Sequence, residues 1–247
     1  MIPLLDFHPP IIAHRGAGSD APENTLAAIR SAHEQGSTWI ELDIKITYDG
    51  IPILMHDDTL ERTTSGAGLV AQATWEDLKK LDAGAKFDSQ FKGEGIPSLE
   101  EAVKLILDLD MSFVAELKPC PGRAKATTMV AMIELAKAWP ERDLLPVIAS
   151  FDMDSLEMAA QLEPHWPRCL LFREWDDQWR QKVSQAGACA ISVSSDQLTR
   201  DRVDEVIRLR IPLLAYTVND PERAKELLAW GASAVYVDSP RSILAEL

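Results

Sequence analysis

Eight short apolar runs recur along the chain, and each is separated from the next by a stretch with helical periodicity. The runs are residues 11–14, 39–47, 112–117, 145–149, 168–172, 188–193, 212–218 and 234–237. Several of them, such as Val147-Ile148-Ala149, lack polar alternation, which is typical of parallel strands covered on both faces. The pattern in 247 residues predicts an α/β fold, a closed (β/α)8 TIM barrel. An open doubly wound sheet would show the same alternation, but no G-x-G-x-x-G follows any run, so a dinucleotide-binding fold is disfavoured.

The stretches between the runs carry apolar residues at helical spacing, as in Leu26 and Ile29, and Asn24 is a candidate N-cap. The alternation breaks at residues 57–98, after the second strand and its hairpin, where glycines are frequent. We interpret this segment as a small insertion that covers the barrel mouth. No linker or low-complexity tract divides the chain, so residues 1–247 are expected to form a single domain.

The charge balance restricts the partners. The chain has 39 acidic and 25 basic residues, and its formal net charge is −14. Such a surface repels polyanions, so nucleic acid is not an expected partner. The charge of an anionic small-molecule substrate would have to be neutralised locally, by a metal ion or by a few well-placed cationic side chains.

Cysteine usage and hydropathy suggest a compartment. Cys120, Cys169 and Cys189 show no CxxC spacing and lie beside apolar residues, as buried thiols in a reducing compartment do. Residues 1–10 lack the cationic start and apolar segment of a signal peptide, and no run has the length of a membrane span. A cytoplasmic protein without stable membrane insertion is therefore expected. The oligomeric state is not predicted.

Polar residues follow the first apolar run and interrupt the second, where a barrel would place its active site. The first run ends in His14-Arg15-Gly16. In the second, Glu41 and Asp43 are two residues apart, so both carboxylates point to one face of the strand. Buried together, they repel each other and lose hydration, and a divalent cation between them would remove both costs. The structural alternatives are a hydrogen-bonded core histidine and a solvent-facing acidic edge strand.

The second run continues into a hairpin. Asp49-Gly50 is a two-residue hairpin signal, and such a loop would pair Tyr48 with Ile51 and Asp43 with His56. Facing residues share one side of a hairpin, so His56 would lie beside the carboxylate pair. A longer loop would shift this register.

The third run ends in Glu116-Leu117-Lys118, again with two charged side chains on one face. The pair could be a structural ion pair, or Glu116 could complete a metal site with Glu41 and Asp43. An all-carboxylate site favours Mg²⁺ or Ca²⁺ over Zn²⁺. Lys118 and Arg15 would then supply local positive charge for a phosphate. Two imidazoles beside a metal suit acid–base catalysis of substitution at phosphorus.

With these residues in place, the chain resembles the bacterial, cytoplasmic-type glycerophosphodiester phosphodiesterase family over nearly its whole length. The segments that carry the resemblance are His14-Arg15-Gly16, residues 21–25, Glu41-Leu42-Asp43, Asp49-Gly50, His56-Asp57, residues 81–84, residues 96–101, Glu116-Leu117-Lys118, Ser150-Phe151, residues 216–219 and Asp238. Two positions depart from the common pattern, because Tyr216 stands where many members have Trp and Val237 where Thr is common. These departures leave the alcohol side of the pocket less defined than the phosphate side.

The resemblance implies a barrel that hydrolyses glycerophosphodiesters to sn-glycerol 3-phosphate and an alcohol. It implies catalysis by His14 and His56, phosphate binding by Arg15 and Lys118, and a divalent cation, Mg²⁺ or Ca²⁺, on Glu41, Asp43 and Glu116. Attack by a neighbouring substrate hydroxyl, with a cyclic phosphate product, and direct attack by water both remain open. The alternatives are a lysophospholipase D with a wider apolar entrance and, from another class, a non-catalytic phosphodiester-binding barrel.

Overall fold

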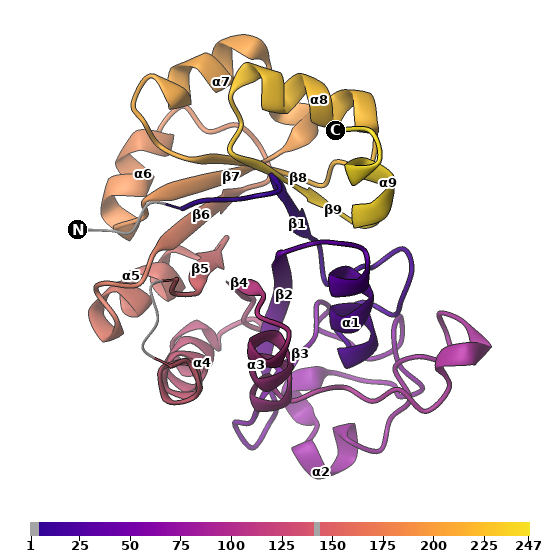
Figure 1. The fold of residues 1–247 in the computed structure, drawn as a ribbon. Helices are drawn as coiled ribbons and strands as arrows, with labels where there is room; N and C mark the ends of the chain where they lie inside the picture. The colour runs from indigo at the N-terminus through magenta and orange to yellow at the C-terminus, as the bar shows by residue number, and fades with distance from the viewer. Residues whose placement is uncertain (1–4, 141–143) are drawn as a thin grey trace.

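The computed structural model describes residues 5–140 and 144–247, and their strands form a closed barrel (Figure 1). Eight parallel strands follow the order β1-β9-β8-β7-β6-β5-β4-β2, and β1 pairs with β2 to close the ring. Figure 1 shows the first and last strands of the chain side by side. The (β/α)8 TIM barrel predicted from the sequence is therefore confirmed.

The strands of the barrel coincide with the eight apolar runs to within two residues at each end. They are β1 (Ile11–Ala13), β2 (Trp39–Ile46), β4 (Ser112–Leu117), β5 (Val147–Ser150), β6 (Arg168–Phe172), β7 (Ala190–Ser194), β8 (Leu213–Tyr216) and β9 (Ala234–Val237). The helices are α1 (Leu26–Glu34), α2 (Trp75–Leu78), α3 (Leu99–Asp108), α4 (Ala124–Ala138), α5 (Met153–Leu162), α6 (Trp179–Ala186), α7 (Arg200–Ile207), α8 (Pro221–Trp230) and α9 (Pro240–Leu244). Three short 3₁₀ turns cover Val70–Gln72, Ser89–Phe91 and Ser195–Gln197. No helix in the described ranges is long and apolar enough to cross a membrane.

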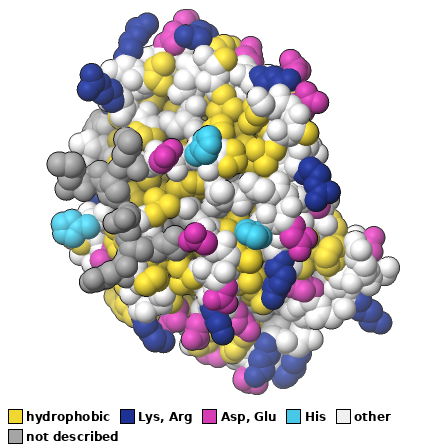
Figure 2. Space-filling model, in the orientation of Figure 1, with side chains coloured by type: hydrophobic (Ala, Val, Ile, Leu, Met, Phe, Trp, Pro, Cys, Tyr) yellow, Lys and Arg dark blue, Asp and Glu magenta, His cyan; other side chains and the backbone are white. Residues whose placement is uncertain are grey.

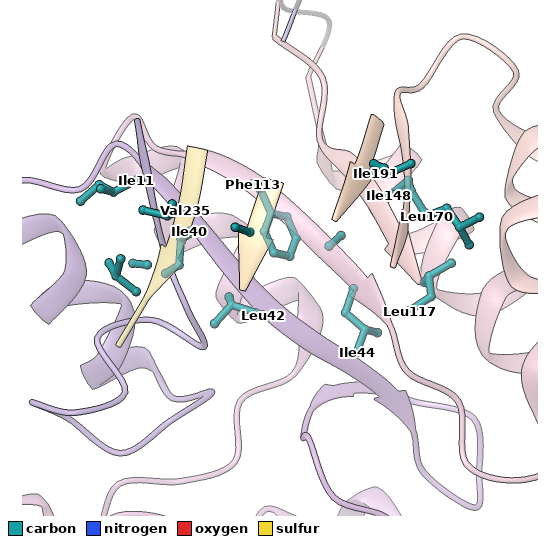
Figure 3. Close-up of a cluster of buried hydrophobic side chains, with 14 of the residues drawn as sticks. Ile11, Ile40, Leu42, Ile44, Phe113, Leu117, Ile148, Leu170, Ile191 and Val235 are labelled. Atoms are coloured by element: carbon teal, nitrogen blue, oxygen red, sulfur yellow. The ribbon is translucent and has the colours of Figure 1, made fainter. Parts of the chain in front are cut away.

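Successive side chains of each strand point to opposite faces and belong to two separate apolar clusters. Ile40, Leu42 and Ile44 of β2 belong to the large cluster between strands and helices, together with Phe113 and Leu117 of β4 (Figure 3). The inward set forms a second cluster inside the barrel, where Phe7 and Trp39 lie with ring centroids 4.5 Å apart. Because β2 is buried along its whole length, its inward positions 41, 43 and 45 place charged groups inside the barrel.

The hairpin after β2 differs from the prediction by one residue. Strand β3 (Pro52–Leu54) pairs antiparallel with β2, with Ile46 opposite Pro52 and Ile44 opposite Leu54. The predicted pairing of Asp43 with His56 is therefore wrong, because the loop holds three residues rather than two: the Thr47 N–H donates to the Ile51 carbonyl. The backbone N–H of Met55 instead donates to the Asp43 carbonyl at 2.9 Å.

Residues 57–98 fold around a small apolar cluster of their own. Its buried members from the segment include Leu60, Val70 and Leu78, and they pack with Ile53 of β3 and Cys120, which follows β4. In Figure 1 this segment, drawn in magenta, extends from one side of the barrel. On the face shown in Figure 2, acidic and basic side chains are interspersed rather than gathered into a patch of one sign.

Candidate active site

Parallel pairing brings the predicted carboxylates together. Asp43 lies opposite Glu116 in the register of β2 and β4, and Glu41 points inward two residues earlier on β2. One oxygen from each of these three carboxylates lies within 4.8 Å of the others, and all three side chains are buried. The sequence predicted this convergence from two separate strands.

Protein groups do not fully satisfy the three carboxylates, which we call the triad. Glu41 accepts a hydrogen bond from the backbone N–H of Arg15 at 3.0 Å through Oε2, but its buried Oε1 has no partner among the described residues. Burial raises the pKa of Glu41 well above its ordinary value, and the charges of Asp43 and Glu116 raise it further. Burial beside Asp43 likewise raises the pKa of Glu116. A cation at the triad would satisfy the free oxygen and favour the ionised carboxylates, so the donor set fits a hard divalent ion.

Asp43 is the carboxylate of the three whose charged form the protein favours most. Burial opposes its charge, but Lys118 and Arg15 outweigh this and hold its pKa well below its ordinary value. Lys118 Nζ lies 3.2 Å from Asp43 and 2.6 Å from Glu116, and Arg15 Nε lies 3.5 Å from Asp43. Both predicted phosphate-binding cations therefore reach the carboxylates, and the predicted Glu116–Lys118 ion pair exists as part of the triad rather than as an alternative to it.

Two imidazoles face the same cavity, and a carboxylate holds each. His14 Nδ1 lies 2.7 Å from Asp238, and His56 Nδ1 lies 2.6 Å from Asp57. Neutral imidazoles that donate through Nδ1 keep Nε2 as an acceptor. Burial lowers the pKa of His56, which favours this neutral form. Thus His56 reaches the site although its predicted register was wrong.

The loop after β1 is shaped by left-handed backbone. Arg15 and Gly16 have φ of 53° and 84°, so the chain turns sharply as it leaves the strand. A Cβ on Gly16 would lie 2.6 Å from the Cβ of Ala28, so only glycine fits there. This turn aims the Arg15 N–H at Glu41.

Several residues complete the site without having been assigned to it from the sequence. Asn24 does not cap α1, as its position had suggested; Thr25 does, by accepting from the Ala28 N–H. The Asn24 side chain instead donates to Asp43 Oδ2 at 2.8 Å and accepts from the Asp43 N–H at 3.0 Å. Asp238 directly follows β9, so the rule that polar residues end barrel strands could have found it.

Arg62, from the 57–98 segment, had no local sequence signal. Its guanidinium donates to Asp57 at 2.6 and 2.9 Å and to Glu23 at 2.6 and 2.8 Å. Glu23 also accepts from Arg15 at 2.9 Å. A chain of ion pairs therefore connects the carboxylate behind His56 with the loop that follows β1.

The cavity lined by these groups has a volume of about 370 Å³. Six of the seven predicted site residues line it, namely His14, Arg15, Glu41, His56, Glu116 and Lys118. The seventh, Asp43, lies just behind them and bonds to Lys118 and Asn24. Strands β5 to β9 supply the opposite wall.

Comparison with known proteins agrees with this geometry. The Glycerophosphoryl diester phosphodiesterase family matches residues 14–242. A glycerophosphodiester phosphodiesterase of Caldanaerobacter subterraneus is 32% identical over 239 residues, which cover 95% of this chain and 96% of that protein. An Oleispira antarctica phosphodiesterase, solved in complex with the product sn-glycerol-3-phosphate, has a TM-score of 0.94 at 34% identity and 96% coverage of both chains. A glycerophosphodiester phosphodiesterase structure from Agrobacterium tumefaciens gives 0.75 at 27% identity, with 99% of this chain and 100% of that one covered. The chain belongs to the glycerophosphoryl diester phosphodiesterase family of enzymes.

Proposed function

We propose that this protein hydrolyses glycerophosphodiesters to sn-glycerol 3-phosphate and an alcohol, with Mg²⁺ or Ca²⁺ on Glu41, Asp43 and Glu116. The observation that carries the proposal is the meeting of three buried carboxylates, one with an unpartnered oxygen, and two carboxylate-held imidazoles around one cavity. The product bound by the Oleispira relative is the one expected here.

The protein's own groups divide the work. Arg15 offers N–H donors and Lys118 a point charge to the phosphodiester oxygens, and both already lie at the triad. One imidazole, in its neutral form, accepts the proton of the nucleophile at Nε2, and the other, in its protonated form, donates the Nε2 proton to the leaving alkoxide. Asp238 and Asp57 fix the rings so that Nε2 serves the substrate. A divalent cation bound to the triad would withdraw negative charge from the phosphoryl oxygens.

Metal removal tests the proposal. We expect the purified protein to release choline from glycerophosphocholine or glycerol from glycerophosphoglycerol, to lose this activity in EDTA, and to regain it with Mg²⁺ or Ca²⁺. Full turnover in the chelated enzyme would contradict the metal site. The test includes lysophosphatidylcholine, because a lysophospholipase D would need an apolar entrance for the acyl chain. Trp75, Phe87 and Phe91 of the 57–98 segment could form such an entrance, but they do not line the cavity. Activity on the lysolipid alone would replace our proposal with a lysophospholipase D, and activity on none of these diesters would favour a binding barrel.

We propose in addition that residues 1–247 act as one domain and that the 57–98 segment covers part of the barrel mouth. The ion pairs of Arg62 with Glu23 and Asp57 support this, because they join the segment to two loops at the cavity. A cytoplasmic location stays a prediction, which fractionation of cells that produce the protein would test.

A further inference from the structure

The wall of the cavity opposite the carboxylates has a different chemistry. It comes from β5 to β9 and the residues that follow them, and it includes Phe151, Arg173, Ser192, Tyr216 and Tyr236. No carboxylate from β5 to β9 is among the residues that line the cavity. Its one formal charge is therefore the positive charge of Arg173.

The guanidinium of Arg173 is free to act on a ligand. Arg173 directly follows β6, is exposed, and forms no hydrogen bond or ion pair with any described residue. Arg15 and Lys118, by contrast, are paired with carboxylates. Asp196 and Glu174 are acidic residues on this side, but both are exposed and neither lines the cavity.

Aromatic packing holds Arg173 at the wall. Its guanidinium carbon lies 5.4 Å from the centroid of the Phe151 ring, and Tyr216 packs edge-on against the same ring at 5.8 Å. Lys118 Nζ also lies 5.5 Å from that centroid. Aromatic rings often bind quaternary ammonium groups, but a ring that already faces two cations offers such a ligand repulsion instead.

The floor of this side offers hydroxyl groups. Ser192 and Tyr236 are buried, and their hydroxyls have no hydrogen-bond partner among the described residues. Buried hydroxyls without partners are costly, so a ligand that hydrogen-bonds to them gains affinity. A hydroxyl-rich ligand matches them and a methylated ammonium group does not.

We propose that Arg173 selects the alcohol of the diester by its charge, so that uncharged polyol or anionic alcohols are preferred over the cationic choline and ethanolamine. The inference rests on the proposed function and adds the substrate class to it. Its physical basis is charge repulsion between Arg173 and a cationic alcohol, which discriminates by disfavouring the wrong ligand.

The test compares kcat/KM for glycerophosphoglycerol and glycerophosphocholine, which differ in the charge of the alcohol. We expect the wild-type protein to prefer glycerophosphoglycerol by about tenfold or more. Arg173→Gln should reduce this preference, Arg173→Glu should reduce it by a further factor of about ten or reverse it, and Arg173→Lys should retain it. The exposed Arg30 of α1, which has no bonded partner among the described residues, provides the control: Arg30→Glu makes the same charge change and should leave the ratio unaltered.

The two proposals fail in different ways. If the wild-type protein hydrolyses both diesters but prefers glycerophosphocholine, or if Arg173→Glu leaves the ratio within about twofold, the charge selection is wrong and the hydrolase function stands. If neither diester is cleaved in the presence of Mg²⁺ or Ca²⁺, both proposals are wrong.

Discussion

At the scale of single residues, each imidazole of the cavity depends on a carboxylate that holds its Nδ1. We predict that His14→Ala and His56→Ala each lower kcat by about 10²–10⁴-fold, because each removes one proton-transfer group. Both side chains are partly exposed, so circular dichroism and the melting temperature should change little. His33, exposed on α1, is the matched control, and His33→Ala should retain full activity. Near-normal kcat in either cavity variant would contradict the acid–base roles.

The unpartnered oxygen of Glu41 leads to a second prediction. Glu41→Gln removes a buried charge, so in EDTA the variant should be at least as stable as the wild type. Added Mg²⁺ or Ca²⁺ at about 100 times Kd should stabilise the wild type by about 2.7 kcal/mol and the variant by much less. Urea denaturation with and without the ion measures both effects. Equal stabilisation of the two proteins would show that Glu41 does not hold the ion.

At the scale of elements, the β2–β3 hairpin depends on one left-handed residue. Gly50 has φ of 83°, and a Cβ placed there would meet no atom within 4 Å, so only the backbone conformation opposes substitution. We expect Gly50→Ala to reduce the free energy of unfolding by about 1 kcal/mol, and Gly50→Asn, which tolerates this conformation better, to reduce it less. Chemical denaturation of the three proteins measures the difference. An unchanged Gly50→Ala variant would mean that the loop adopts another conformation.

The same hairpin shows what a local sequence pattern can and cannot predict. The turn signal Asp49-Gly50 identified the hairpin correctly, but it could not give the loop length. Asp49 accepts hydrogen bonds from Thr47 at 2.6 Å and from the Trp75 N–H at 3.0 Å, and the second donor is 26 residues away. A contact with a distant segment thus contributes to the loop, and no two-residue rule contains that information.

At the scale of the whole molecule, Arg62 ties the 57–98 segment to the barrel, and this link should depend on pH. Hydrogen bonds from Arg62 hold the pKa of Asp57 well below its ordinary value of about 3.9. A lowered folded-state pKa stabilises the fold above about pH 4, and the stabilisation is lost as the pH falls further. We therefore expect the free energy of unfolding to fall more steeply between pH 5 and pH 3 for the wild type than for Arg62→Met.

Urea denaturation at several pH values tests this expectation, with Arg30→Met as a control that removes an exposed arginine without a partner in residues 5–140 and 144–247. At pH 7 the Arg62→Met variant should be the least stable of the three proteins, because Glu23 is partly buried and loses a partner. Parallel pH curves for the wild type and Arg62→Met would show that the ion pairs add nothing to the attachment.

The sequence by itself determined the barrel, and it predicted seven candidate site residues, six of which line the cavity. Alternating apolar runs identify parallel strands, and a two-residue spacing inside a strand assigns Glu41 and Asp43 to one face regardless of what lies around them. Tertiary structure alone decided the rest. The register between β2 and β4 sets Asp43 beside Glu116, Asn24 leaves the helix cap to bond Asp43, and Arg62 reaches Glu23 across 39 residues. Such contacts depend on how separate segments pack in space, and local sequence propensity does not predict that packing.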